Sequence, residues 1–380
     1  MSKEKLEPQR TQGVTGHDWA FHQSFPKCFL KCLGRTFSSQ SFLSNLFCPI
    51  YAFRPMRLLY TKPLTQDTQS QIARLRSGDA RALARAISTV ENRADGWSEL
   101  LKAIFPYTGK ARVIGLTGAP GAGKSTLVDQ LAKYYRKQNR SVGIIAVDPT
   151  SPYTGGAIVG DRIRMQDHYG DPGIYIRSMA TRGSLGGLAR ATADAVAVLD
   201  ASGRDLVMIE TVGVGQDEVD IVRLADVTVV ILVPGMGDDV QTIKAGIMEI
   251  ADIFVINKSD YEGAERVERE IRAMQSLAAR HDRWTPPIVK TVASQGVGTE
   301  ELAGAIVDYE TYLKKENLVF KKNVENWQER LVEMLRDAML EKARAQMDGD
   351  RLERYAGEIA EHKRDPYSLV EEIVRGVDPT

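Results

Sequence analysis

The stretch GLTGAPGAGKST at residues 115–126 fits the pattern G-x-x-x-x-G-K-[ST] from Gly118 to Ser125. A short apolar run precedes it and a helical pattern follows, which is the context in which this pattern holds nucleotide phosphates. The glycines let backbone N–H groups approach the phosphates, while Lys124 is expected to reach the β- and γ-phosphates and Ser125 to bind Mg²⁺. The predicted phosphate-binding residues are Gly118, Ala119, Pro120, Gly121, Ala122, Gly123, Lys124, Ser125 and Thr126. The loop alone does not separate a motor, a kinase and a switch.

A second motif indicates which base the nucleotide carries. The residues N-K-S-D at 257–260 directly follow an apolar run and fit the N-K-x-D pattern of GTPases. A carboxylate at Asp260 can accept hydrogen bonds from N1–H and the 2-amino group of guanine, whereas adenine would face it with a lone pair. Lys258 is expected to lie along the base plane, and Asn257 is expected to brace the loops. The residues predicted to bind guanine are Asn257, Lys258, Asp260, Ala293 and Ser294, the last two through a backbone N–H to O6.

Three carboxylates are placed to manage a metal ion beside a triphosphate. Asp148 and Glu210 end apolar runs, and Asp161 lies in a glycine-flanked loop. Each can serve as a Mg²⁺ ligand, as an acceptor behind the ligands or as a positioner of the attacking water, and the residues alone leave these roles open. The predicted metal-binding set is Ser125, Asp148, Asp161 and Glu210.

The residues after Glu210 indicate how the γ-phosphate is sensed. The sequence E-T-V-G at 210–213 stands where many GTPases have D-x-x-G, so Gly213 is the candidate backbone donor to the γ-phosphate. No glutamine follows Gly213 directly, since Gln216 comes three residues later. We therefore expect slow intrinsic hydrolysis, with a partner completing the site.

The elements that must position these residues alternate along residues 110–295. Runs that are apolar throughout, at 112–116, 142–147, 174–177, 206–210, 227–233, 253–256 and 288–292, are separated by helical stretches. This pattern predicts an α/β fold of the P-loop NTPase type, with a mostly parallel sheet covered by helices and the site at the carboxyl ends of the strands. Helical periodicity precedes the sheet at about 66–105 and follows it after about 300.

The predicted domains follow from these patterns. They are an atypical extension at 1–55, a helical segment at 56–108, a GTPase domain at 109–315 and a helical arm at 316–380. Within the arm, one apolar stripe is formed by Trp327, Leu331, Met334, Leu335, Ala338 and Met339. The stripe either packs on its own domain or serves as a dimerisation face.

Composition limits the remaining possibilities. Fifty basic residues balance fifty acidic ones over 380 residues, so no overall field favours nucleic acid or an anionic membrane, and the longest apolar run is too short to span a bilayer. All three cysteines lie within the first 48 residues, which indicates a reducing compartment. Residues 1–55 are acid-poor and serine-bearing, so they form either an organellar transit peptide or an irregular extension. We expect a cytoplasmic protein, or a mitochondrial matrix protein if residues 1–55 are a transit peptide.

Several motifs in order closely resemble the MeaB/ArgK family, the G-protein chaperones of adenosylcobalamin-dependent acyl-CoA mutases. The resemblance is dense over about residues 66–310 and loose over the C-terminal helices. The segments that carry it are GDARALARAISTVE (78–91), GLTGAPGAGKSTLVDQL (115–131), AVDPTSPYTGGAIVGDRIRM (146–165), IETVGVGQDE (209–218), LVPGMGDDVQTIKAGIMEIAD (232–252) and NKSD (257–260).

The resemblance implies a SIMIBI-type P-loop GTPase that works as a homodimer through its C-terminal arm. It also implies GTP, GDP and Mg²⁺ as cofactors, and methylmalonyl-CoA mutase or a relative as the partner whose cofactor loading is gated and protected. By the family pattern, GDDVQTIKAG is an additional switch that brings Gln241 and Lys244 toward the nucleotide. The implied catalytic set is Lys124, Asp148, Asp161, Glu210, Gln241 and Lys244. None of the five histidines lies in a D-x-H-x-x-G context, so the cobalamin is expected to belong to the partner.

Two alternatives remain. A transport-system kinase would need a base for an acceptor hydroxyl, and no H-R-D-x-x-x-x-N signature is present. A metallochaperone GTPase for nickel enzymes would need His-rich or Cys-rich tracts, and the residues after 48 contain no cysteine.

Overall fold

The computed structural model describes residues 66–148, 168, 170–180, 187–211, 224–235, 250–277, 284–345, 347 and 349–376. The transit peptide or irregular extension expected at residues 1–55 lies outside the described residues. Within the described ranges, no helix is long and apolar enough to cross a membrane.

The seven apolar runs form the seven strands of one sheet, as predicted. The strands are β1 (Arg112–Gly118), β2 (Val142–Asp148), β3 (Ile174–Ala180), β4 (Leu206–Glu210), β5 (Val227–Leu232), β6 (Ile253–Ile256) and β7 (Ile288–Lys290). Their order in the sheet is β3-β2-β4-β1-β5-β6-β7, and every neighbouring pair is parallel. Strands β4, β5 and β6 are buried along their whole length, which explains why their sequences are apolar rather than alternating. The predicted fold class is confirmed.

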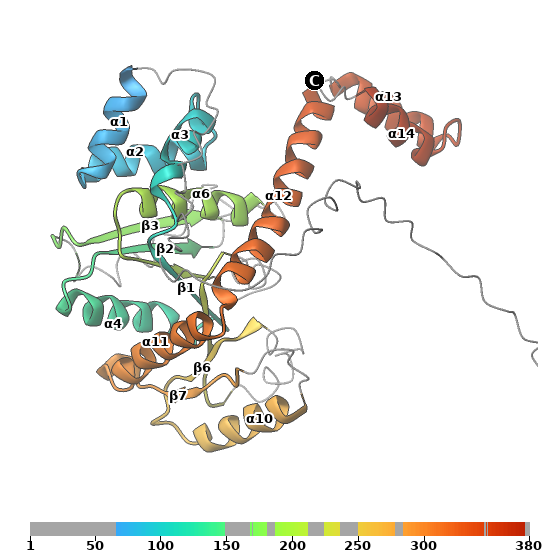
Figure 1. Ribbon diagram of the computed structural model, residues 1–380. Coiled ribbons are helices and arrows are strands. Elements are labelled where there is room, and N and C mark those ends of the chain that lie inside the picture. The colour runs from blue at the N-terminus through green and yellow to red at the C-terminus, as the bar shows by residue number, and fades with distance from the viewer. Residues whose placement is uncertain are drawn as a thin grey trace, which may run out of the picture. The chain divides into compact units, whose positions relative to one another are not determined.

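Helices cover both faces of the sheet (Figure 1). On one face, α4 (Lys124–Lys137) and α11 (Thr299–Lys315) pack against side chains such as Leu116 of β1. On the other face, α6 (Gly187–Ala201) packs against β2 and β4, and α10 (Ala264–Leu277) covers β5 and β6.

The N-terminal helices lie over α6. They are α1 (Gln66–Arg76), α2 (Ala80–Glu91), α3 (Trp97–Ile104) and the short 3-10 helix η1 (Phe105–Tyr107). Helix α2 begins after Asp79, whose carboxylate accepts hydrogen bonds from the N–H groups of Arg81 and Ala82 at 2.9 and 3.1 Å. Its apolar residues Leu83 and Ile87 are buried in the same core as α6. The helical lead-in predicted at 66–105 is therefore present.

Three helices follow α11 among the described residues, within the helical arm predicted at 316–380. They are α12 (Leu318–Ala345), α13 (Gly349–Ala360) and α14 (Pro366–Gly376). Helix α14 begins after Asp365, which accepts a hydrogen bond from the N–H of Ser368 at 2.8 Å. In the sequence, the start of this helix is marked by a capping carboxylate followed by proline.

Helix α12 contacts the rest of the chain through charged side chains and through the ring of Trp327, which lies edge-on to Phe105, although none of its residues is buried. Arg330 pairs with Asp194 of α6 at 3.1 Å, Asp337 pairs with Arg190 of α6, and Glu341 pairs with Arg93. We call these six residues the ionic seat. Burial raises the pKa of Asp194 above its ordinary value, which Arg330 and Arg190 partly offset. Near its start, α12 is also held by Lys322, whose Nζ donates to the carbonyl of Asp226 at 2.7 Å.

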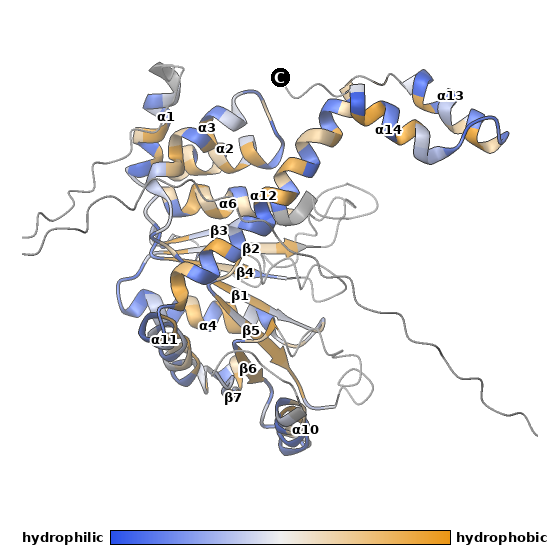
Figure 2. Cartoon of the chain, turned by 45° about the vertical axis from the view of Figure 1, so that its right-hand side comes forward, coloured by the Kyte–Doolittle hydropathy of each residue, from blue (hydrophilic) through white to orange (hydrophobic). Residues whose placement is uncertain are grey.

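The apolar stripe of α12 lies on a different side of the helix from the ionic seat. At about 100° per residue, Val324, Leu331 and Leu335 project away from the side that carries Arg330, Asp337 and Glu341. These three apolar side chains are exposed, as are Phe320 and Met339. Hydrophobic and hydrophilic residues alternate in bands along α12 (Figure 2). One stripe residue, Trp327, lies edge-on to Phe105 of the same chain with ring centroids 5.9 Å apart, while Leu331 and Leu335 are exposed among the described residues. The two alternatives that the sequence left open, packing on its own domain and dimerisation, both stay predictions.

Candidate nucleotide site

The phosphate loop begins where β1 can continue only with a glycine. Gly118 has φ +147°, and a Cβ at this position would lie 2.2 Å from the carbonyl oxygen of Ile231 on β5. The loop ends at Gly123, with φ +90°, and α4 begins at Lys124 as predicted. The strand and the helix are thus joined by a loop whose backbone only glycine can follow at both ends.

The side chain of Lys124 lies over the loop backbone. Its Nζ donates to the carbonyl oxygens of Gly118 at 2.8 Å and Ala119 at 3.1 Å, and the residue is only 6% exposed. A buried ammonium held at the N-terminus of α4, beside the N–H groups of a glycine-rich loop, is a favourable environment for phosphate.

Ser125 and Glu210 come together across the sheet. The hydroxyl of Ser125 donates to Oε1 of Glu210 at 2.6 Å, and both residues are buried. A hydroxyl and a carboxylate at the phosphate loop are oxygen donors of the kind that Mg²⁺ prefers, so the two residues fit a Mg²⁺ site. Among the residues that the structure describes, no group of three or more His, Cys, Asp or Glu side chains is placed to hold a metal ion. Further protein ligands would have to come from elsewhere in the chain.

Asn257, the first residue of the N-K-S-D motif, joins the phosphate loop to the loop that follows β7. Its Nδ2 donates to the carbonyl of Ala122 at 2.8 Å. Its Oδ1 accepts hydrogen bonds from the hydroxyl of Thr291 and from the N–H of Ala293, both at 3.0 Å. Asn257 is 2% exposed, so these bonds are shielded from water. The expectation that Asn257 braces the loops agrees with this geometry.

The remaining residues of the N-K-S-D motif, 258–260, form a loop whose side chains are less buried than Asn257. Lys258 has φ +54°, and the next residue, Ser259, donates its N–H to the carbonyl of Thr291 at 3.1 Å. Asp260 is exposed, as a carboxylate that reads an incoming base must be. Because Asn257 already binds the N–H of Ala293, the N–H of Ser294 is left as the candidate donor to guanine O6.

Thr291 was not among the predicted site residues, although its hydroxyl holds Asn257 in place. Its signal was a hydroxyl residue at the end of an apolar run, since Thr291 directly follows β7 and is fully buried. Thr117 and Thr211, which also stand near the ends of apolar runs, were not among the predicted site residues either.

The remaining predicted residues are only partly covered by the structure. Asp148 is the last residue of β2, and its side chain is not among those described. Asp161, Gly213, Gln241 and Lys244 lie outside the described residues altogether. Their roles stay predictions.

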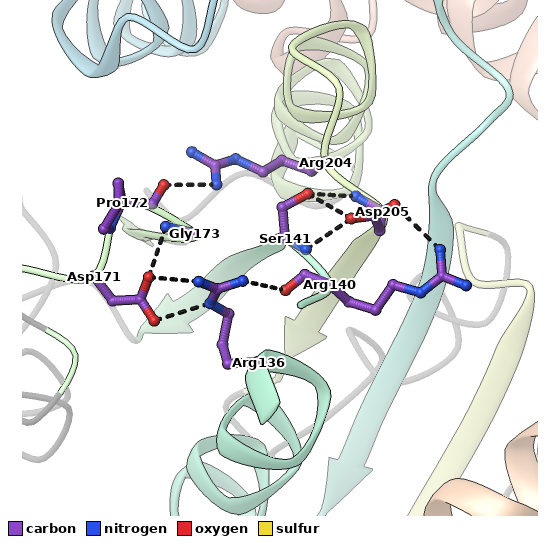
Figure 3. Close-up of polar contacts among 8 residues, drawn as sticks. All are labelled: Arg136, Arg140, Ser141, Asp171, Pro172, Gly173, Arg204 and Asp205. Carbon is purple, nitrogen blue, oxygen red and sulfur yellow. Dashed lines mark hydrogen bonds and ion pairs between the residues drawn. The ribbon is translucent and has the colours of Figure 1, made fainter. Parts of the chain in front are cut away.

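At the opposite end of the sheet, a polar network fixes α4 and the edge strand β3 (Figure 3). Arg136, near the end of α4, binds both carboxylate oxygens of Asp171 at 2.8 and 2.9 Å and donates to the carbonyl of Arg140. The guanidinium holds the pKa of the Asp171 carboxyl below its ordinary value. Beside it, Asp205 accepts hydrogen bonds from the N–H and hydroxyl of Ser141 at 2.7 and 2.8 Å. These contacts fix α4 at the end that lies away from Lys124.

The comparisons with known proteins agree on one family. A family model described as "Methylmalonyl Co-A mutase-associated GTPase MeaB" matches residues 83–348. A protein of Pyrococcus abyssi, named a GTPase, is 48% identical over 309 residues, which are 80% of this chain and 95% of that protein. The mouse protein named "Methylmalonic aciduria type A homolog, mitochondrial" is 33% identical over 311 residues, which are 75% of each chain. A solved structure described as an "LAO/AO transport system kinase" has a TM-score of 0.63 at 27% identity and covers 83% of this chain and 99% of its own.

Glycine-to-alanine substitutions at two positions of the phosphate loop should have different effects. At Gly123, an added Cβ would lie 2.3 Å from Nδ2 of Asn257, whereas at Gly121, with φ +76°, it would meet no atom within 4 Å. We expect Gly121→Ala to cost about 1–2 kcal/mol through backbone strain alone. Gly123→Ala should cost roughly 3 kcal/mol or more, because it also displaces Asn257. Urea unfolding of the nucleotide-free variants measures both losses, and equal losses would contradict the bracing role of Asn257.

Proposed function

The chain belongs to the MeaB family of methylmalonyl-CoA mutase-associated GTPases and is a GTPase, and we propose that it is a nucleotide-dependent chaperone of an adenosylcobalamin-dependent acyl-CoA mutase. In this role it docks on methylmalonyl-CoA mutase or a relative, gates the loading of the cofactor and protects the mutase or restores it. The structural observation that best supports a guanine-nucleotide switch is the carboxamide of Asn257, which links the phosphate loop to the loop after β7.

In the proposed site, each described residue has a defined task. Lys124 binds the β- and γ-phosphates from its place over the loop backbone, and Asp260 selects guanine. Ser125 and Glu210 hold Mg²⁺ together with carboxylates from Asp148 and Asp161. A bound Mg²⁺ neutralises charge on the phosphate oxygens. Glu210, buried beside Ser125, also orients the attacking water or the ligands that hold it.

The partner is proposed to complete this site. The chain has no glutamine directly after Gly213, and Gln241 and Lys244 lie in the segment that resembles the family's additional switch. Docking of the mutase is proposed to bring these two residues to the nucleotide. GTP hydrolysis is then slow in the free protein and faster in the complex, as in other GTPases that borrow a catalytic group.

We also propose a homodimer formed through α12. The ionic seat holds the helix by its charged side, and this leaves the apolar stripe exposed. Exposed apolar side chains at helical spacing along most of the helix favour association with a similar stripe, because association removes them from water. A second copy of the same helix offers such a stripe.

Leu331→Asp tests the dimer. Leu331 is half exposed in the stripe, so the substitution should leave the fold intact and convert dimers to monomers in light scattering after size exclusion. Arg336→Asp, on the same helix but away from both the stripe and the ionic seat, is the matched control and should remain dimeric. A wild-type protein that is monomeric at micromolar concentration would contradict the proposal.

Asp260→Asn tests the base assignment. An amide presents a donor where guanine N1–H needs an acceptor, so affinity should shift from GTP toward XTP, as measured by competitive titration. The exposed carboxylate of Asp308 on α11 provides the control, and Asp308→Asn should keep the wild-type preference. Unchanged selectivity in Asp260→Asn would show that Asp260 does not contact the base.

The chaperone role is tested by phosphate release from GTP with and without purified acyl-CoA mutases. We expect low turnover alone and an increase of at least about tenfold with the client, since catalytic groups supplied by a partner have effects of this size or larger. Absence of binding and of stimulation by every acyl-CoA mutase tested would overturn the proposal. Transfer of the γ-phosphate to a protein instead of water would favour the kinase alternative, the activity for which the solved relative is named.

A further inference from the structure

Two buried threonines are hydrogen-bonded to each other beside the proposed nucleotide site. One lies directly before the phosphate loop, and the other lies two residues before Gly213. The hydroxyl of Thr211 donates to the hydroxyl of Thr117 at 3.1 Å. Thr117 is fully buried and Thr211 is 2% exposed. Thr117 directly precedes Gly118, and Thr211 directly follows Glu210. The contact therefore joins the residues next to two parts of the proposed nucleotide site.

Near the phosphate loop, strand β1 is paired with β5 over a longer stretch than with β4. Strand β1 stays in register with β5 as far as Gly118, which lies opposite Ile231. With β4 the register ends earlier, at Leu116 opposite Glu210. Beyond that point, Thr211 is held to β1 by its N–H, which donates to the carbonyl of Leu116 at 3.1 Å, and by the threonine contact. The hydroxyl pair thus extends the connection between the two strands after the ladder has ended.

The neighbouring contact between Ser125 and Glu210 cannot take over this task when the site is loaded. Its two oxygens are those proposed to bind Mg²⁺, so the metal competes with their direct hydrogen bond. The hydroxyl groups of Thr117 and Thr211 are not assigned to Mg²⁺, and they are buried in contact with each other, so their hydrogen bond is compatible with a loaded site.

We propose that Thr117 and Thr211 are positioning residues. Their hydrogen bond sets the distance between the phosphate loop, which is proposed to bind the β-phosphate, and Gly213, which is proposed to bind the γ-phosphate. The inference rests on the proposed nucleotide site. The loop after Thr117 is assigned to the β-phosphate, while the chain after Thr211 leads to Gly213, which is assigned to the γ-phosphate. GDP needs only the first of these, whereas GTP needs both at the correct separation. The pair consequently contributes to the discrimination between GTP and GDP.

The central test is the double variant Thr117→Val/Thr211→Val in the full-length protein. Valine has nearly the same shape, and removing both hydroxyl groups leaves neither one unpaired, so Tm should stay near that of the wild type. Each single variant leaves one buried hydroxyl without its partner and should lower Tm by a few degrees. In all three variants, affinity for a non-hydrolysable GTP analogue with Mg²⁺ should fall about tenfold, which corresponds to about 1.4 kcal/mol, while GDP affinity stays nearly constant.

Two further variants exclude a purely structural explanation. Thr211→Ser keeps the hydroxyl and should restore the wild-type ratio of GTP to GDP affinity. Thr228→Val is the matched control, because Thr228 is a fully buried threonine of β5 whose hydroxyl has no hydrogen-bond partner among the described residues. It should change neither affinity.

The outcomes are separable. A double variant with wild-type discrimination, or a Thr211→Ser variant as impaired as Thr211→Val, would overturn the positioning role. The proposed nucleotide site would instead be contradicted if the wild-type protein did not bind GTP. It would also be contradicted if the Lys124→Ala variant bound GTP with the same affinity as the wild type. If wild-type binding depends on Lys124 and the threonine variants change nothing, only the threonine proposal fails.

Discussion

One buried side-chain amide connects the parts of this site that lie farthest apart in the sequence. Asn257 donates to the backbone of the phosphate loop 135 residues earlier and accepts from the loop after β7. The phosphate loop has glycines with positive φ at both ends, and the loop after β7 contains the short 3-10 helix η3 (Ala293–Gln295) followed by Gly296 and Gly298, also with positive φ. A parallel sheet brings the starting points of both loops to the same end of the strands, and the side chain of Asn257 bridges the gap between them. The tight space at Gly123 follows from this, because the amide of Asn257 occupies the place of a Cβ.

At the opposite end of the strands, a second set of polar contacts holds helix α4 in place. There Asp205 and Arg136 bind backbone groups of neighbouring segments, and the bidentate pair of Arg136 with Asp171 joins α4 to the start of β3. Each of these charged groups has several hydrogen-bond donors or acceptors. It can therefore bind several backbone groups in segments that lie outside the hydrogen-bonded strands. Helix α4 is therefore held at both ends, by the phosphate loop at Lys124 and by Arg136 near its last turn. A rigid helix keeps its N-terminal N–H groups aimed at one point.

Much of this arrangement could be predicted from the sequence because the informative residues adjoin strands that are apolar throughout. The strand pattern located the edge of the sheet, and the motifs at 118–125 and 257–260 located the residues on it. Contacts between hydroxyl groups were not predictable, since Thr117 and Thr211 lie 94 residues apart and resemble ordinary strand residues. The ionic seat was equally hidden. Arg190 and Asp337 lie on separate helices, and charged residues at such positions normally face water.

The ionic seat and the apolar stripe give α12 two attachments that respond oppositely to the solvent. Dissolved salt screens the charges of the ionic seat, although partial burial limits the screening. Strongly hydrated salts such as sulfate strengthen apolar association, because they are excluded from the protein surface. Rising sulfate concentration therefore weakens the ionic seat and raises the free-energy cost of leaving the stripe exposed to water. The two sides of α12 thus respond oppositely to the same salt.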